Sequence, residues 1–143
     1  MKKIGVIGSR KRNIRTDYQL VHDVFFEIYD EGDWIVSGGC PKGGDAFAEK
    51  IAFSYGIPIL LFPPKKHTRF EFFARNTSVA ENSDHIIACL VNPSDSLTDI
   101  YGRKFGGTED TIRKFLKKRG YFDFHFKEGI PVPDSHKKRI TIV

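Results

Sequence analysis

Apolar residues along the chain fall into short β-branched runs that alternate with longer segments of helical spacing. Four runs have the length and composition of buried strands, at residues 4–7, 34–37, 57–62 and 85–91. The intervening and following segments have helical character, at residues 16–29, 46–55, 69–81 and 108–119. This alternation is typical of βαβ units around a mostly parallel sheet. We therefore predict an α/β fold, a Rossmann-like α/β/α sandwich of three layers, formed by one domain over residues 1–143.

Local signals indicate where the helices begin and end. Thr16 and Gln19 form an apparent capping box in front of an apolar stripe, Leu20, Val21, Val24, Phe25, Ile28 and Tyr29. Gly56 closes the second helix. The helix that begins at Thr108 has acidic residues in its first turn, basic residues in its last turn, and Gly120 as a stop. Both charge placements suit a helix macrodipole.

Three segments do not fit the repeating pattern. Residues 92–107 form a stretch long enough to be a functional or mobile loop. Residues 122–126 alternate with a period of two, and residues 139–143 resemble a last strand. These two segments predict an antiparallel pair at the sheet edge.

Composition and charge exclude several classes of protein. No apolar run approaches the length of a membrane span, and the first apolar run is too short for a signal peptide, so we expect a cytoplasmic protein with no membrane partner. Two cysteines give no disulfide framework, and five scattered histidines give no metal-ligand spacing, so neither a metal nor a cofactor is expected. The net charge of +5 comes largely from three basic clusters, at residues 10–15, 117–119 and 137–139. Such clusters attract phosphate, although solvated surface explains the last two equally well.

Three glycine-bearing turns lie where predicted strands end or a helix begins. In an open parallel sheet such turns meet in one crevice, where glycine lets the backbone approach a phosphate and a helix start supplies free amides. The predicted nucleotide or phosphate site consists of Gly8, Ser9, Arg10, Ser37, Gly38, Gly39, Lys42, Gly43, Gly44, Asp45, Arg75, Asn76, Gly106, Gly107 and Thr108. Several members have simpler explanations: Ser37, Asp45 and Thr108 as caps, and Asn76 as a partner of a neighbouring loop. The aromatic residues Phe70, Phe72 and Phe73 are better explained by core or dimer packing than by base stacking.

Neither standard phosphate-binding motif is present. Residues 39–44 lack the Gly-Lys-Ser/Thr ending of a P-loop, and no Gly-x-Gly-x-x-Gly follows the first strand. Triphosphate hydrolysis and ordinary NAD chemistry are therefore disfavoured.

The order of these motifs resembles the SLOG superfamily, which unites DprA/SMF DNA-processing proteins with LOG phosphoribohydrolases of the "lysine decarboxylase-like" group. The resemblance spans residues 3–118 and rests on five segments, Gly8-Ser9-Arg10, residues 36–45, Arg75-Asn76, residues 80–84 and Gly106-Gly107-Thr108. It implies a Rossmann-like fold, a nucleotide-type small-molecule ligand and self-association as a homodimer.

The resemblance leaves the activity open. LOG enzymes cleave the N-glycosidic bond of nucleoside monophosphates with an arginine, matched here by Arg75, and a glutamate, where this chain has Thr111. Glu109 or Asp110 would replace that glutamate only if the helix start is rotated. Our leading hypothesis is therefore a binding module for a nucleotide, nucleotide sugar or ADP-ribose-type ligand. The alternatives are a phosphoribohydrolase with Arg75 and Glu109 as catalytic residues and, less favoured, a DprA-like protein that binds single-stranded nucleic acid through its basic clusters.

Overall fold

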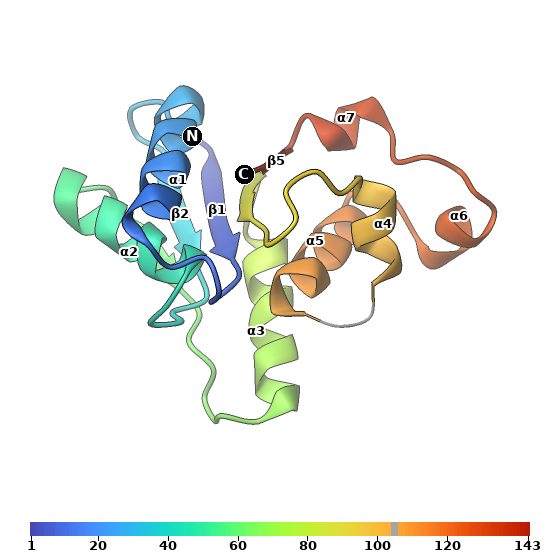
Figure 1. Cartoon of the computed structure of the whole chain (residues 1–143), viewed down its shortest axis with the longest axis horizontal. Helices are drawn as coiled ribbons and strands as arrows, with labels where there is room; N and C mark the ends of the chain where they lie inside the picture. The colour runs from blue at the N-terminus through green and yellow to red at the C-terminus, as the bar shows by residue number, and fades with distance from the viewer. Residues whose placement is uncertain (104–105) are drawn as a thin grey trace.

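The computed structural model describes residues 1–103 and 106–143 and contains a five-stranded, all-parallel sheet (Figure 1). The strands are β1 Lys3–Gly8, β2 Trp34–Ser37, β3 Ile59–Leu61, β4 His85–Cys89 and β5 Ile140–Ile142. Their spatial order is β3-β2-β1-β4-β5, so β1 lies between β2 and β4 at the centre. The predicted Rossmann-like α/β fold is confirmed, and β4 is buried along its whole length, as its apolar sequence predicts.

Helices cover both faces of the sheet (Figure 1). On one face lie α1 Arg15–Ile28 and α2 Gly44–Tyr55, and on the other α3 Arg69–Glu81, α4 Leu97–Gly102 and α5 Gly107–Lys118. Alternate residues of each strand enter the two cores: Ile87 and Cys89 of β4 pack with α1 and α2, whereas Ile86 and Ala88 pack on the opposite side. The three layers therefore follow from the two-residue period of the strands and the apolar stripes of the helices.

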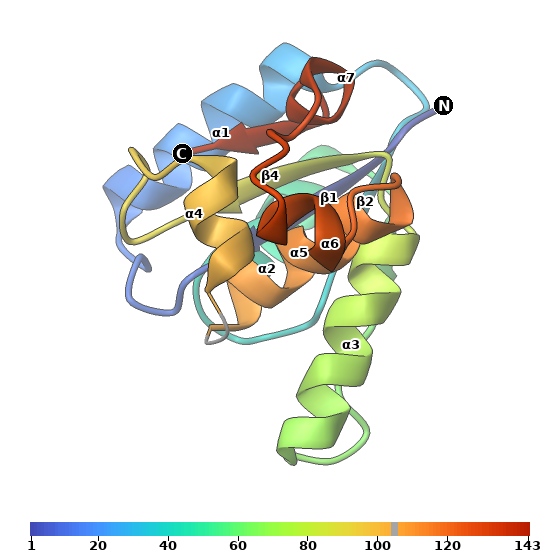
Figure 2. The same cartoon turned by 90° about the vertical axis from the view of Figure 1, so that its right-hand side faces the viewer.

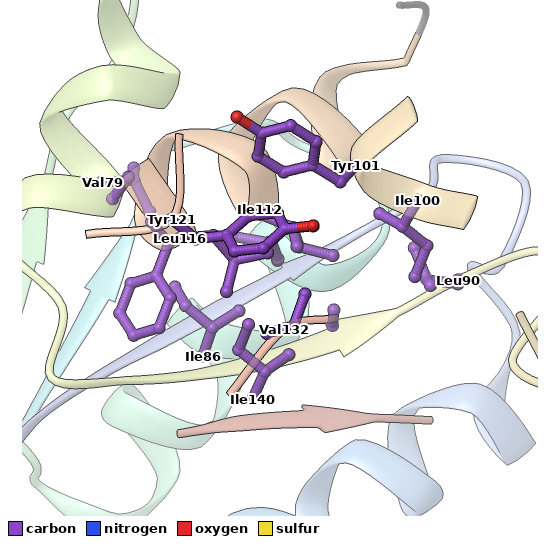
Figure 3. Packing of buried hydrophobic residues seen from close by; sticks show 14 of the residues in the cluster. Val79, Ile86, Leu90, Ile100, Tyr101, Ile112, Leu116, Tyr121, Val132 and Ile140 are labelled. Carbon is purple, nitrogen blue, oxygen red and sulfur yellow. The ribbon is translucent and has the colours of Figure 1, made fainter. Parts of the chain in front are cut away.

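Figure 3 shows the core on the α5 side of the sheet. Ile112, Phe115 and Leu116 of α5, the residues predicted to form its buried edge, have no exposed surface. In Figure 3, Ile112 and Leu116 lie above Ile86 of β4 and Ile140 of β5, and Phe115 belongs to the same cluster. The segments that follow α5 also contribute to this core, through buried residues such as Tyr121 and Val132.

The start of α1 differs from the prediction. The helix begins one residue before Thr16, with Ile14 as its N-cap, and the Asp17 carboxylate accepts the backbone N–H of Ile14 at 3.3 Å. Asp17 also forms an ion pair with Arg12 at 3.0 Å, and this contact joins the first turn of α1 to the segment before it. Thr16 is therefore not the cap, and Leu20 lies outside the buried stripe, with 48% of its surface exposed.

The antiparallel pair predicted near the C-terminus is wrong. Residues Asp123–Lys127 form a short helix, α6, and β5 runs parallel to β4 after a further short helix, α7 Asp134–Lys137. The Asp123 carboxylate holds α6 in place, because it accepts hydrogen bonds from Tyr101, Arg113 and Lys117. The long segment 92–107 is likewise not all loop, since α4 lies within it. Of this segment, residues 104–105 lie outside the described residues.

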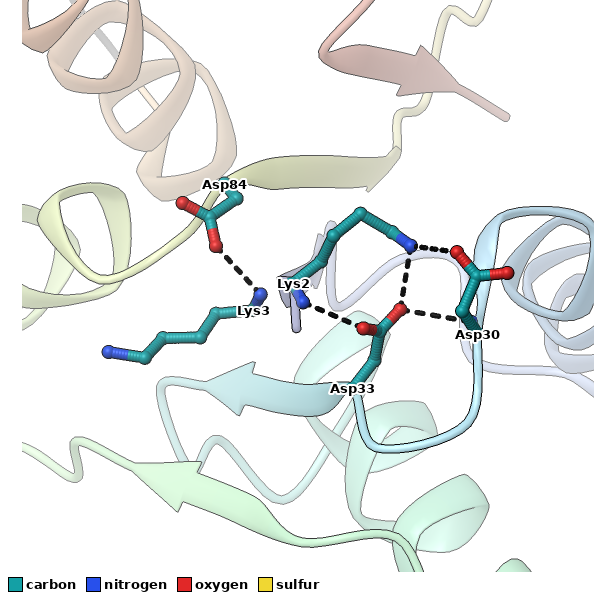
Figure 4. A network of polar contacts seen from close by, with 5 residues as sticks. All are labelled: Lys2, Lys3, Asp30, Asp33 and Asp84. Carbon is teal, nitrogen blue, oxygen red and sulfur yellow. Dashed lines mark hydrogen bonds and ion pairs between the residues drawn. The ribbon is translucent and has the colours of Figure 1, made fainter.

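A charged network joins the beginnings of β1, β2 and β4 (Figure 4). Lys2 Nζ contacts the carboxylates of Asp30 at 2.5 Å and Asp33 at 2.8 Å, and the backbone N–H of Lys2 donates to Asp33 at 2.7 Å. Burial alone would raise the pKa of Asp33, but these hydrogen bonds hold it below its ordinary value. Asp84 accepts the backbone N–H of Lys3 at 2.9 Å and ties the start of β4 to the same end of the sheet. The network lies at the amino ends of the strands, away from the edge where a ligand is expected.

His85 makes the fold sensitive to acid. Its ring lies 2.9 Å from Thr141 Oγ1 of β5, and burial, assisted by the charges of Arg139 and Lys2, lowers its pKa from 6.5 to about 4. The unfolded chain therefore binds this proton more tightly than the folded protein, so stability falls as the pH drops from 6.5 towards 4. We expect His85 to account for a loss of about 2 kcal/mol in the free energy of unfolding between pH 7 and pH 5.

Urea unfolding at the two pH values measures this effect. His85→Gln keeps a polar partner for Thr141 but removes the titration, so its stability should depend less on pH than that of the unmodified protein. Equal dependence in both proteins would show that other groups are responsible.

Within residues 1–103 and 106–143, the structure contains no helix with the length and apolar character needed to cross a membrane.

Candidate functional site

A cleft of about 640 Å³ lies at the carboxyl ends of the central strands. β1 is flanked by β2 on one side and β4 on the other, and the helices that follow β1 and β3 cover opposite faces of the sheet. This is a topological switch point, the place where open α/β sheets bind their ligands. The cleft walls come from the turn after β1, the loop after β2, the face of α3 and the start of α5.

Most of the predicted site residues line this one cleft. Those in its wall are Gly8, Ser9, Arg10, Gly38, Asp45, Arg75, Asn76, Gly106, Gly107 and Thr108, together with Glu109. The remaining predicted residues lie at the end of β2, in the loop after it and at the start of α2, and are not among the lining residues: Ser37, Gly39, Lys42, Gly43 and Gly44. The structure therefore brings the three glycine turns together, but only part of the second turn faces the cleft.

Side chains accept hydrogen bonds from three backbone N–H groups of the loop between β2 and α2. Gly43 N–H donates to Asn13 Oδ1 at 2.8 Å, Cys40 N–H to Asp45 Oδ2 at 3.1 Å, and Gly39 N–H to Ser37 Oγ at 3.2 Å. These amides were expected to hold a phosphate. In the structure, side chains of the protein already occupy them, so the loop acts as a support for Asp45.

Gly44 is required for close packing. A methyl group on its Cα would lie less than 3.0 Å from backbone atoms of Ile7 and Gly8, at the end of β1. The first residue of α2 therefore touches the end of the central strand. This contact positions Asp45, the next residue of the helix, at the floor of the cleft.

Asp45 and Arg75 form the buried charged pair of the site. Arg75 Nη1 lies 3.8 Å from Asp45 Oδ2 and donates to the carbonyl oxygen of Gly38 at 3.4 Å, and the two side chains are only 11% and 12% exposed. Burial raises the pKa of Asp45, although the Arg75 charge and backbone N–H donors oppose the shift. A carboxyl group with a raised pKa in a cleft is a recognised indicator of a functional position. The long Arg75 contacts leave its remaining guanidinium donors available to the cleft.

Asn76 has a structural partner, as the sequence allowed, but this partner lies on helix α5 and not in a neighbouring loop. Asn76 Nδ2 donates to Asp110 Oδ2 at 3.0 Å, and Lys114 Nζ lies 2.9 Å from the same oxygen. Asp110 is therefore engaged between α3 and α5 and does not replace the glutamate of the LOG motif. Thr111, at that motif position, is buried and donates to the carbonyl oxygen of Gly107 at 2.8 Å.

Glu109, at the start of α5, contributes a carboxylate to the cleft wall. It is the third residue of the helix, and its side chain folds back over Gly106. If Gly106 were alanine, its methyl group would collide with Glu109 Oε2. The positive φ of Gly106, 104°, also favours glycine at this position.

Several lining residues were not predicted as site residues, among them Lys11, Arg69, Phe72 and Phe73. The last three lie on α3 at helical spacing with Asn76 and Val79, so a helical-wheel reading of this segment, anchored on Asn76, would have found them. Phe72 and Phe73 are half-buried in the cleft wall, whereas Phe70 is 77% exposed. The first turns of α3 project beyond the neighbouring helices (Figure 2).

Comparison of the chain with protein-family models, characterised proteins and solved structures finds no match. Among the described residues, no group of three or more histidine, cysteine, aspartate or glutamate side chains is placed to hold a metal ion.

Proposed function

We propose that the protein binds a nucleotide or a related phosphorylated ribose compound in the cleft at the carboxyl ends of β1 and β4. The observation that carries this proposal is the convergence of cationic, hydroxyl and aromatic side chains on one cleft at the switch point of the sheet. Arg10, Lys11, Arg69 and Arg75 suit a phosphate group. Phe72 and Phe73 offer apolar ring surface for a base.

Calorimetry and thermal unfolding against a panel of nucleotides, nucleotide sugars and ADP-ribose test the proposal. A ligand at one hundred times its Kd should stabilise the fold by about 2.7 kcal/mol. Absence of any stabilisation or heat of binding across the panel would contradict it.

The Arg10→Ala variant tests whether the ligand binds in the cleft. Arg10 is an exposed residue of the cleft wall, so its loss should weaken binding by roughly tenfold, the value of one charge-assisted hydrogen bond, and leave the fold intact. Arg15→Ala is the matched control, because it removes the same charge from an exposed position of α1 that does not line the cleft. Equal weakening in both variants would indicate nonspecific attraction by net charge.

One observation favours the hydrolase alternative: Glu109 and Arg75 line the same cleft. A carboxylate near the sugar is what N-glycosidic cleavage requires, to stabilise positive charge or to activate water. Free base released from nucleoside monophosphates in the same incubations would identify this activity, and intact nucleotide recovered after prolonged incubation would exclude it for those substrates.

A further inference from the structure

Positive and negative side chains of the cleft wall come from different elements of the fold. Positive side chains come from the turn after β1, with Arg10 and Lys11, and from α3, with Arg69 and Arg75. A negative side chain, Glu109, lies at the start of α5. The other carboxylate of the wall, Asp45, is paired with Arg75. The cations of the wall therefore come from the turn after β1 and from α3, whereas its one carboxylate without an ion-pair partner among the described residues comes from the start of α5.

The start of α5 is a poor place for a ligand phosphate. A helix N-terminus attracts anions through its amides and its dipole. Here the Glu109 carboxylate bends back over Gly106 and lies beside the start of the helix, although no side chain caps α5 by a hydrogen bond. A phosphate placed there would meet a negative charge, whereas a hydroxyl group would find an acceptor. Carboxylate oxygens only accept hydrogen bonds, so a hydroxyl is the matching ligand group.

The turn after β1 has the opposite character. Arg10 and Lys11 are exposed, and among the described residues neither forms an ion pair. Their neighbour Arg12 differs, because it is engaged by Asp17 and by the carbonyl oxygen of Leu90 at 2.8 Å. The turn itself is fixed: Ser9 N–H donates to the Cys89 carbonyl at 2.9 Å, and Ser9 Oγ accepts Lys11 N–H at 3.2 Å. Two uncompensated cations thus stand on a fixed turn at the cleft.

We infer that the cleft binds a nucleoside 5′-monophosphate in one orientation. The phosphate lies at Ser9-Arg10-Lys11, and the ribose hydroxyls donate hydrogen bonds to the Glu109 carboxylate. This inference rests on the proposed function and makes it more specific. It requires free ribose hydroxyls, and it disfavours ligands that carry a second phosphate on one of these hydroxyls, because that phosphate would face Glu109. Glu109 is therefore the specificity-determining residue of the site.

Equilibrium binding to two kinds of probe tests the orientation. The first probes are the 5′-monophosphates of adenosine, guanosine, cytidine and uridine. The second is the tightest-binding nucleotide of these four with a further phosphate on its 3′ hydroxyl. The unmodified protein should bind the bisphosphate at least about tenfold more weakly than the monophosphate, because like charges are brought together.

Glu109→Gln should remove this discrimination. The amide keeps an acceptor oxygen of similar shape but loses the charge, so monophosphate binding should weaken and bisphosphate binding should tighten until the two affinities agree within about threefold. Arg10→Ala should weaken both probes by the same factor. Glu27→Gln, which removes a negative charge from an exposed residue of α1 outside the cleft, is the matched control and should change neither affinity.

Three results would overturn the inference. The first is bisphosphate binding by the unmodified protein that equals or exceeds monophosphate binding, a result that needs no variant. The second is a Glu109→Gln protein that binds the monophosphate more tightly, which would place the phosphate at α5. The third is discrimination that survives in Glu109→Gln. If none of the four monophosphates binds but another panel member does, the orientation inference alone fails; if nothing in the panel binds, the proposed function fails with it.

Discussion

Replacement of Gly44 by alanine is expected to destabilise the protein by about 3 kcal/mol or more. The added methyl group would lie against backbone atoms of Ile7 and Gly8, which cannot move without disturbing the central strand. Flexible side chains relieve such clashes cheaply, but the backbone of Ile7 and Gly8, which is paired with β4, does not. Urea unfolding followed by circular dichroism measures the loss, and an insoluble or unfolded variant would represent its upper end.

Gly107→Ala is the matched control for this substitution. Gly107 is the first residue of α5, as Gly44 is the first residue of α2, and a methyl group there would meet only Asn76 Nδ2, at 3.8 Å. Alanine is also the better helix former, by about 1 kcal/mol within a helix. The Gly107 variant should therefore be as stable as the unmodified protein or slightly more stable. Similar losses in both variants would refute close packing as the reason for Gly44.

Replacement of Arg75 by methionine is expected to cost about 3 kcal/mol at pH 7, because it leaves the Asp45 carboxylate buried without its counter-charge. Burial already raises the pKa of Asp45, and loss of Arg75 should raise it further. A carboxyl group with a raised pKa binds its proton more tightly in the folded state, so lower pH favours folding of the variant. The loss in the free energy of unfolding should therefore be smaller at pH 5 than at pH 7.

A double-mutant cycle distinguishes this effect from loss of packing. Adding Asp45→Asn to Arg75→Met removes the stranded charge and should recover much of the stability. Arg69→Met is the control, since Arg69 is an exposed residue of the same helix with no ion-pair partner among the described residues. If Arg69→Met and Arg75→Met cost the same, or if the second substitution recovers nothing, the charged pair does not support the site.

Elements with a strong period or a terminal glycine could be predicted from the sequence. The bounds of α3 agree with the prediction, and α2 ends at Gly56 in the left-handed conformation as expected. The start of α1 was missed because its N-cap is Ile14 and not Thr16. The Asp17 carboxylate accepts the backbone N–H of Ile14 and pairs with Arg12. The tail was missed because five residues are too few to separate the two periods, and α6 is held by contacts of Asp123 with residues of α4 and α5.

The position of the cleft was predictable from the sequence, but the contacts of its residues were not. Ligands bind at the carboxyl ends of parallel strands, and this rule predicted that Gly8, Gly38 and Gly106 line one cleft, as they do. The sequence could not show that Gly43 donates to Asn13, thirty positions earlier, or that Asp45 occupies the amide of Cys40. The same glycine pattern is compatible with amides that face a ligand and with amides that the protein itself occupies, and only the fold decides between them.

The hydrogen bonds that hold the loop after β2 have a consequence for the energetics of the proposed ligand binding. The shape of this loop is maintained by Ser37, Asn13 and Asp45, so capture of a small molecule requires no ordering of this segment. If a ligand binds in the cleft as proposed, binding avoids the entropic penalty that a flexible glycine-rich loop would impose, because this wall of the cleft is preorganised. Hydrogen exchange at Gly39, Cys40 and Gly43 should accordingly be slow from the outset.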